Sequence, residues 1–103
     1  MYNIIIKDLY FIWDEAKNID NKKKHGLSFE EAKKVFWDED AILFDDPDHS
    51  VYEERFLIMG IAGKKGICIV SHCYRENDSV IRLISARKAT NNEKRIYRER
   101  RQL

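Results

Sequence analysis

Apolar runs separated by short polar segments fill the second half of the chain. The run from Val80 to Ala86 is mostly aliphatic, with one charged residue, Arg82, inside it. Aliphatic and β-branched residues in so short a run are typical of a strand that is buried on at least one face. Two similar runs precede it, Arg55 to Ala62 and Ile67 to Tyr74. Because only short polar turns join the three runs, the pattern predicts an antiparallel meander.

The first half of the chain shows helical signals instead. Asp14 is a suitable N-cap for a helix that runs to about Lys24, and Gly26 suits the left-handed position after such a helix. Ser28 and Glu31 have the spacing of a capping box, so a second helix begins there. The two helices predict a hairpin that covers one face of the sheet.

Three further elements complete the prediction. Residues 2–13 contain one or two short strands, and Ala41 to Phe44 form another, followed by an acidic loop at residues 45–49. Thr90 and Glu93 form a second capping box at the start of a last, basic helix. This helix has little apolar surface, so we expect it to dock lightly or to contact a partner.

The length of 103 residues predicts one domain, residues 1–103, and the order of strands and helices predicts the α+β class. The chain is 44% hydrophobic and 36% charged, without repeats or low-complexity segments. It has no signal-peptide pattern and no apolar run of membrane-spanning length, which predicts a cytoplasmic protein without a membrane partner.

Candidate cofactor sites are missing from the sequence. Cys68 and Cys73 lie five residues apart on opposite faces of one predicted strand, which argues against a mutual disulfide. The chain has neither the Cys/His spacing of a zinc site nor a glycine-rich phosphate loop. The carboxylates at residues 45–49 lack the ligand pattern of a calcium loop. We therefore expect no metal and no cofactor.

Charge is divided unevenly along the chain. Residues 1–54 hold seven Lys/Arg and fourteen Asp/Glu, whereas residues 55–103 hold twelve and four, although the net charge is only +1. Either the basic half binds a polyanion, or opposite charges intermix on the folded surface and cancel.

The unusual charges in or beside the apolar strands are candidates for chemistry on phosphate. Arg55, Arg82 and Arg87 suit the stabilisation of an anionic phosphorus centre, and a histidine or glutamate is suited to proton transfer in RNA cleavage. His72, His25 and Glu54 are the candidate bases. The structural alternatives are a satisfied strand histidine for His72, a helix cap for His25 and a pair with a buried carboxylate for Arg82.

Geometry poses one difficulty for this hypothesis. Arg82 and Arg87 are five residues apart, so they point to opposite faces of a regular strand. A bulge or a strand end near Ala86 would be needed to bring them to one face.

Several ordered stretches resemble the BrnT family of type II toxin–antitoxin toxins. The stretches are FIWD at residues 11–14, KHGLSFEEA at 24–32, DDP at 45–47, ERF at 54–56 and ISARKAT at 84–90. The resemblance covers residues 11 to about 98. It implies a RelE-like fold and a small ribonuclease that inhibits translation. It also implies a ribbon-helix-helix antitoxin of the BrnA type, two toxins with two antitoxins, and operator DNA bound only through the antitoxin.

The resemblance and the chemistry together define the site predictions. The predicted catalytic residues are Arg82, Arg87, Arg55, His72 and Glu54, of which His72 rests on chemistry alone. The predicted RNA-binding residues are Lys24, His25 and Lys88, and the predicted antitoxin contacts are Arg95, Ile96 and Tyr97. The alternative function is a non-catalytic module that binds RNA or protein and acts as a co-repressor.

Overall fold

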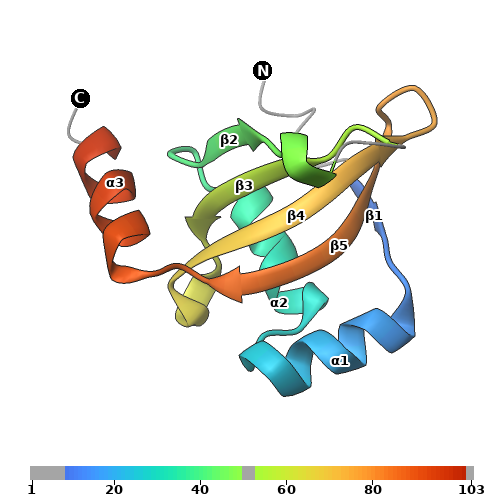
Figure 1. Cartoon of the computed structure of the whole chain (residues 1–103), viewed down its shortest axis with the longest axis horizontal. Coiled ribbons are helices and arrows are strands. Elements are labelled where there is room, and N and C mark those ends of the chain that lie inside the picture. The colour runs from blue at the N-terminus through green and yellow to red at the C-terminus, as the bar shows by residue number, and fades with distance from the viewer. Residues whose placement is uncertain (1–8, 50–52, 102–103) are drawn as a thin grey trace.

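A five-stranded sheet with helices on one face and a further helix at one end makes up the protein (Figure 1). The computed structural model describes residues 9–49 and 53–101. The strands are β1 (Tyr10–Ile12), β2 (Ile42–Asp45), β3 (Phe56–Ile61), β4 (Ile67–Arg75) and β5 (Val80–Lys88). The helices are α1 (Glu15–His25), α2 (Phe29–Ala32) and α3 (Asn91–Arg101), with the short 3-10 helices η2 (Lys33–Trp37), η3 (Pro47–His49) and η4 (Gly63–Lys65).

The strand order is β1-β5-β4-β3-β2, and the predicted meander of β3, β4 and β5 is confirmed. β2 is also antiparallel to β3, but β1 runs parallel to β5. The sheet is therefore mixed, and the expectation of an antiparallel sheet was wrong. The reason is that β1 pairs with a strand some seventy residues later, Tyr10 with Val80, so no local turn sets its direction. The part of the first predicted strand segment at residues 2–8 lies outside the described residues.

Both predicted N-terminal helices are present, and their caps are the expected ones. The Asp14 side chain accepts hydrogen bonds from the first turn of α1, and Gly26 ends it with φ +65°. Ser28 and Glu31 form a complete capping box. The second helix is shorter than predicted, because α2 passes after Ala32 into the 3-10 helix η2. Figure 1 shows α2 behind the sheet and α1 beside the edge of β5, where Asn21 hydrogen-bonds the Ala86 backbone.

The main core lies between these helices and the sheet. Leu27, Phe29 and Val35 are fully buried against residues such as Val70 and Leu83 on β4 and β5. η2 lies very close to β3 at Gly60, where a Cβ atom would be 2.9 Å from both Asp38 Oδ2 and Val35 Cγ1. Glycine is thus what allows η2 to approach the sheet. We call the face of the sheet that carries Val70 and Leu83 the helix-covered face.

α3 docks on the opposite face through a stripe of residues spaced four apart. Tyr97 is the centre of that stripe and only 1% exposed, above a second core cluster that contains Met59 and Ile69. The polar contacts of the stripe are Glu93 with Arg87, Tyr97 with Asp38 and Arg101 with Asp40. Tyr97 is the one buried residue of α3, which agrees with the expectation of a lightly docked helix, and polar side chains supply much of its docking.

Two further findings concern the whole described chain. Cys68 and Cys73 are both buried and free. None of the helices among residues 9–49 and 53–101 has the length and apolar character needed to cross a membrane.

Candidate active site

A β-bulge in β5 decides where the two strand arginines point. Ser85 pairs with Ser71 and Leu83 pairs with His72, which leaves Ile84 without a partner on β4. The extra residue reverses the alternation of side chains along β5. Arg82 and Arg87, opposite Cys73 and Ile69, consequently lie on the same face of the sheet.

We call this surface the arginine face, defined by Arg82 and Arg87 on β5 together with Ser71, Cys73 and Ser85 between or beside them. It is the face that α1 and α2 leave uncovered. The Cα positions of the residues opposite the two arginines, Ile69 and Cys73, are four residues apart on β4, or roughly 13 Å. Two arginine side chains at this separation are able to contact one strand of a polyanion.

Arg87 is held in place by α3. Its Nη1 and Nη2 atoms donate to the two carboxylate oxygens of Glu93 at 2.8 and 2.9 Å. Glu93 Oε1 also accepts from the backbone N–H of Thr90 at 2.8 Å, so the same carboxylate caps α3. The hydrogen bond from Arg87, opposed by partial burial and helped by Thr90, lowers the pKa of Glu93 to about 2. The guanidinium is thus fixed by a bidentate pair while its side chain is still 43% exposed.

Beside Arg87 is a small hollow of about 90 Å³ at the end of α1. His25, Ser71, Ser85 and Arg87 contribute its polar side chains. A histidine, two hydroxyls and a guanidinium therefore meet at the edge of the arginine face. His25 was predicted as an RNA-binding residue and as one candidate base, and it is the predicted histidine that the structure brings next to an arginine.

The other end of the arginine face holds a charged cluster around Cys73. Glu53 accepts from Arg75 Nη2 at 2.8 Å and from Arg55 Nε at 3.3 Å. The Arg75 hydrogen bond is the main reason that the pKa of Glu53 lies below its usual value. Arg82 lies close enough to influence the pKa of Cys73, whose burial raises it. Among residues 9–49 and 53–101, Arg82 makes neither a hydrogen bond nor an ion pair with its side chain.

His72 does not belong to this site. It lies on the helix-covered face, is 0% exposed, and packs with its ring 4.9 Å from the Phe36 ring. Burial lowers its pKa to about 4. Its position in the core keeps it off the arginine face, so the structure does not bring the predicted catalytic residue His72 together with Arg82 and Arg87.

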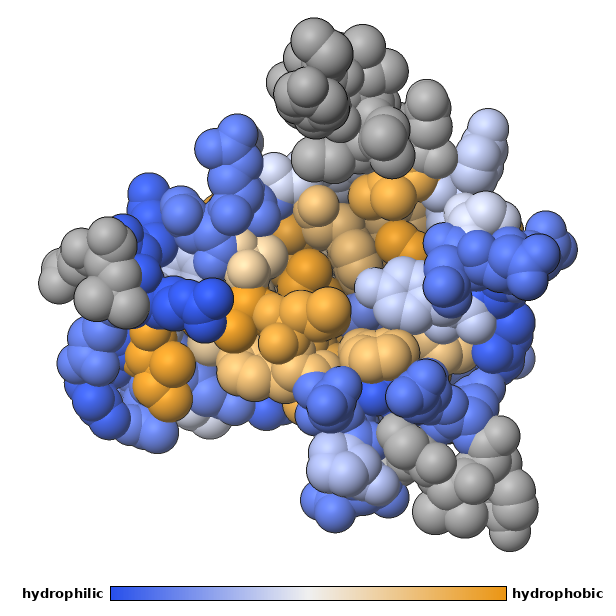
Figure 2. Space-filling model, turned by 90° about the horizontal axis from the view of Figure 1, so that it is seen from above, coloured by the Kyte–Doolittle hydropathy of each residue, from blue (hydrophilic) through white to orange (hydrophobic). Residues whose placement is uncertain are grey.

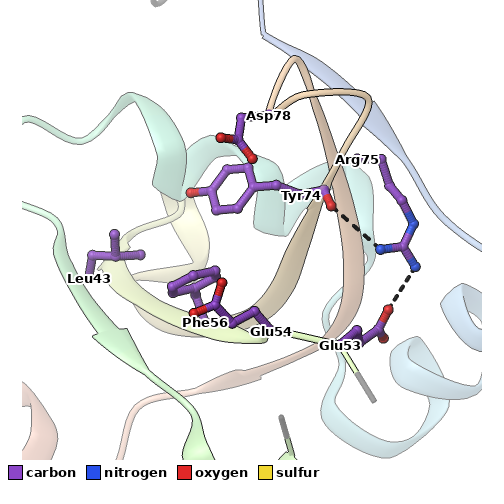
Figure 3. Close-up of a pocket in the computed structure, with 7 residues that line it drawn as sticks. All are labelled: Leu43, Glu53, Glu54, Phe56, Tyr74, Arg75 and Asp78. Carbon is purple, nitrogen blue, oxygen red and sulfur yellow. Dashed lines mark hydrogen bonds and ion pairs between the residues drawn. The ribbon is translucent and has the colours of Figure 1, made fainter. Parts of the chain in front are cut away.

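Glu54 lies in a separate pocket of about 500 Å³ at the end of the strands (Figure 3). Figure 3 shows its carboxylate beside the Phe56 ring, while Asp78 lies over the Tyr74 ring. Arg75 is turned toward Glu53 and away from both rings. The lining of this pocket includes neither Arg82 nor Arg87, so the structure does not bring Glu54 next to either of these two arginines.

The remaining predicted residues are scattered. Lys24 is exposed in the last turn of α1. Lys88 is opposite Cys68, so it points away from Arg87. Of the predicted antitoxin contacts, Arg95 and Ile96 are exposed on α3, whereas Tyr97 is buried against its own sheet.

Comparison with known proteins adds the decisive observation. Residues 13–93 match the family model described as ribonuclease toxin, BrnT, of type II toxin–antitoxin system. The chain belongs to the BrnT family. Its fold is similar to the 1.1 Å crystal structure of the Brucella abortus ribonuclease toxin BrnT, with a TM-score of 0.61 and 25% identity over 81% of this chain and 99% of that chain. The search of curated proteins found no match.

Membership of the BrnT family makes the chain a toxin and an endoribonuclease with a cognate antitoxin. The arginine face has the groups that such an activity needs: guanidinium groups for phosphate, hydroxyls, and a histidine at the edge. Among the described residues, no group of three or more His, Cys, Asp or Glu side chains is arranged to hold a metal ion.

Sequence reasoning missed several residues of this surface. Ser71 and Ser85 carry no signal in the sequence, because their importance depends on strand register. Glu53, rather than its neighbour Glu54, is the carboxylate that joins Arg55 and Arg75. The irregular spacing of Arg82 and Arg87 was the one signal that pointed to the bulge.

Proposed function

We propose that this BrnT-family chain is a RelE-like, metal-independent endoribonuclease that cuts RNA on its arginine face and thereby inhibits translation. The observation that carries the proposal is the bulge at Ile84, which is consistent with Arg82 and Arg87 acting on one substrate strand. The small hollow with His25 beside Arg87 supports the same location for the chemistry.

Arg87 and Arg82 have different roles in this proposal. Arg87, oriented by Glu93, binds the scissile phosphate and stabilises the charge that grows on its oxygens in the transition state. Arg82 has no ion pair among the described residues and is available for a neighbouring phosphate. Arg55, which is paired with Glu53, assists at the far end of the face.

His25 is the proton-transfer group in this proposal, in place of His72. The ribose 2′-oxygen attacks the adjacent phosphorus, and the bond to the 5′-oxygen breaks. His25 accepts the proton of the 2′-hydroxyl, and the leaving 5′-oxygen takes up a proton from solvent or an acid. The products are a 2′,3′-cyclic phosphate and a 5′-hydroxyl, so no metal or redox partner enters the balance.

An RNA cleavage assay in the presence of EDTA tests the proposed activity and its location. We expect the wild-type chain to release fragments ending in 2′,3′-cyclic phosphate. Arg87→Ala and His25→Ala should each lower kcat by about 100-fold or more, which is typical for loss of a charge-stabilising or proton-transfer group. Arg100→Ala is the matched control, since its side chain is exposed and lies outside the arginine face.

Three results would contradict the proposal. Cleavage that is abolished by EDTA and restored by a divalent ion would refute metal independence. Cleavage that is unchanged in Arg87→Ala and Arg82→Ala would show that the active site lies outside the arginine face. Tight RNA binding without any cleavage would favour the alternative of a non-catalytic co-repressor.

The family implies an antitoxin, and we further propose that it is a ribbon-helix-helix protein forming a complex of two toxins and two antitoxins. In such a complex, operator DNA is contacted only by the antitoxin. Light scattering on the purified complex gives its mass, and a gel-shift assay with the toxin alone should show no operator binding. A complex of one toxin and one antitoxin would refute this stoichiometry.

A further inference from the structure

An apolar hollow lies between α3 and the strands, adjacent to the arginine face. It has a volume of about 330 Å³, and its apolar lining comes from three strands and one helix. The apolar side chains are Phe44 on β2, Leu57 and Met59 on β3, Ile69 on β4 and Ile96 on α3. A hollow lined by apolar side chains can bind an apolar side chain of another molecule.

The rim of the hollow is exposed to an unusual degree for large apolar residues. Phe44 is 37% exposed and Ile96 is 42% exposed. β2 is moreover an edge strand of the sheet. Figure 2, which views the molecule from the side on which β2 lies in Figure 1, shows hydrophobic side chains gathered in the middle with hydrophilic ones around them. Contiguous exposed apolar surface ringed by polar groups is typical of a protein–protein interface.

The charge beside the hollow indicates the chemistry of the partner. α3 carries Lys94, Arg95, Arg98, Arg100 and Arg101 against Glu93 and Glu99. Arg95 is paired with Glu99, and Arg101 with Asp40. Within the described part of the chain, Lys94, Arg98 and Arg100 have no ion pair. Asp45, Arg87 and Glu93 are the charged residues in the lining of the hollow. The unpaired cations of α3 lie beside it, and a segment with apolar and acidic side chains complements them.

We propose that this hollow is the anchor pocket for the cognate antitoxin, which inserts an apolar side chain between Phe44 and Ile96 and sets acidic residues against α3. The proposal rests on the antitoxin partnership implied by the BrnT family. Arg87 and Glu93 also line the hollow, so a segment anchored there covers Arg87. Occupation of the pocket therefore blocks the arginine face, and neutralisation follows from steric exclusion of RNA.

Affinity measurements on purified toxin and cognate antitoxin test the pocket. Ile96→Glu and Phe44→Glu place a carboxylate at an apolar anchor that faces acidic groups, and we expect each to weaken binding by about 30-fold or more, as for central interface residues. Ile19→Glu is the matched control: Ile19 is likewise an isoleucine on a helix, 50% exposed, and does not line the hollow. Binding should change by less than about threefold in this control.

A second readout separates this inference from the proposed catalysis. Cleavage of RNA by free Ile96→Ala and Phe44→Ala should equal that of the wild type, because these changes add no charge to the hollow that Arg87 also lines. Ile96→Ala and Phe44→Ala repeat the test with smaller changes, and thermal unfolding checks that each variant is folded.

The inference is overturned if folded variants bind the antitoxin as the wild type does. It is also overturned if cleavage falls while antitoxin affinity stays the same, since the hollow would then serve the RNA. A wild-type chain that binds the antitoxin but does not cleave RNA would refute the proposed activity alone, and the affinity comparison would still decide the pocket.

Discussion

Asn21 is the buried polar residue that joins α1 to the sheet. Its side-chain amide donates to the backbone oxygens of Leu27 and Ala86 at 2.9 and 2.8 Å, and its Oδ1 accepts from the Ala86 N–H at 3.0 Å. β1 pairs with β5 only as far as Arg82, so Ala86 lies on a stretch of β5 edge that β1 leaves open. One amide side chain thus satisfies backbone groups that another strand would otherwise satisfy. This contact holds the end of α1, and with it His25, next to Arg87.

The pair of Arg87 and Glu93 makes stability depend on pH in a defined range. Because the folded pKa of Glu93, about 2, lies below its ordinary value of 4.5, the pair stabilises the fold above pH 4.5. That contribution is lost as the pH falls from 4.5 toward 2. We expect Glu93→Gln, which keeps a capping side chain, to be about 1 kcal/mol less stable than the wild type at pH 7 and nearly equal to it at pH 2.

Chemical denaturation of both proteins across this pH range measures that difference. Other carboxylates with lowered pKa values, such as Glu53 and Asp38, are present in both proteins, so their titration cancels. A stability difference that is the same at pH 7 and pH 2 would show that the charge of Glu93 does not matter.

At the scale of elements, α3 shows how a basic helix is held on a sheet with few apolar residues. The stripe of Glu93, Tyr97 and Arg101 presents one side chain per turn to Arg87, Asp38 and Asp40. Asp38 itself accepts from Tyr97, from the Ile61 N–H at 2.7 Å and from the Asp40 N–H at 2.9 Å. Burial raises the pKa of Tyr97, and its hydrogen bond to Asp38 raises it further. η2, β3 and α3 are therefore tied together at one carboxylate.

Removal of that hydrogen bond should loosen α3. We expect Tyr97→Phe to reduce the free energy of unfolding by about 1–2 kcal/mol, since Asp38 loses one of its donors while the ring stays buried. Hydrogen exchange of the α3 amides should become faster, with little change in β4 amides. Equal exchange in α3 of the variant and the wild type would mean that apolar packing alone docks the helix.

At the scale of the whole molecule, the two charge hypotheses are each partly supported. Ion pairs such as Arg75 with Glu53, Lys65 with Glu31 and Arg101 with Asp40 join the basic half of the chain to the acidic half. These pairs neutralise part of the surface. Arg82 has no such partner among the described residues, and it lies on the face that the N-terminal helices leave uncovered. The chain therefore has a near-neutral net charge and still offers a local site for a polyanion.

Salt dependence of RNA binding tests this distribution. RNA with 2′-O-methyl groups lacks the attacking hydroxyl, so affinity is measured without cleavage. We expect Arg82→Ala to reduce the slope of log affinity against log salt by about 0.7, the value for one lost contact to a single-stranded phosphate. Arg100→Ala, an exposed arginine outside the arginine face, should leave the slope unchanged. Equal slopes for the wild type and Arg82→Ala would show that Arg82 does not contact an RNA phosphate.

The parts of the fold that were predictable depend on local chemistry. Asp14, the Ser28–Glu31 box and the Thr90–Glu93 box placed the helix starts, because a cap is a contact between residues at most three apart. The apolar runs and turns placed β3, β4 and β5 to within two residues. The ordered motifs also led to the BrnT family, which the family model confirms.

The features that only the tertiary structure decided depend on long-range pairing. The sequence by itself determined which residues form strands and helices, and that arginines accompany the last strand. Strand register determined that Ile84 is a bulge and that Arg82 and Arg87 share a face; packing determined that His72 and Tyr97 are buried while His25 is beside Arg87. A one-residue change of register moves every side chain to the other face, so no local pattern specifies such a site.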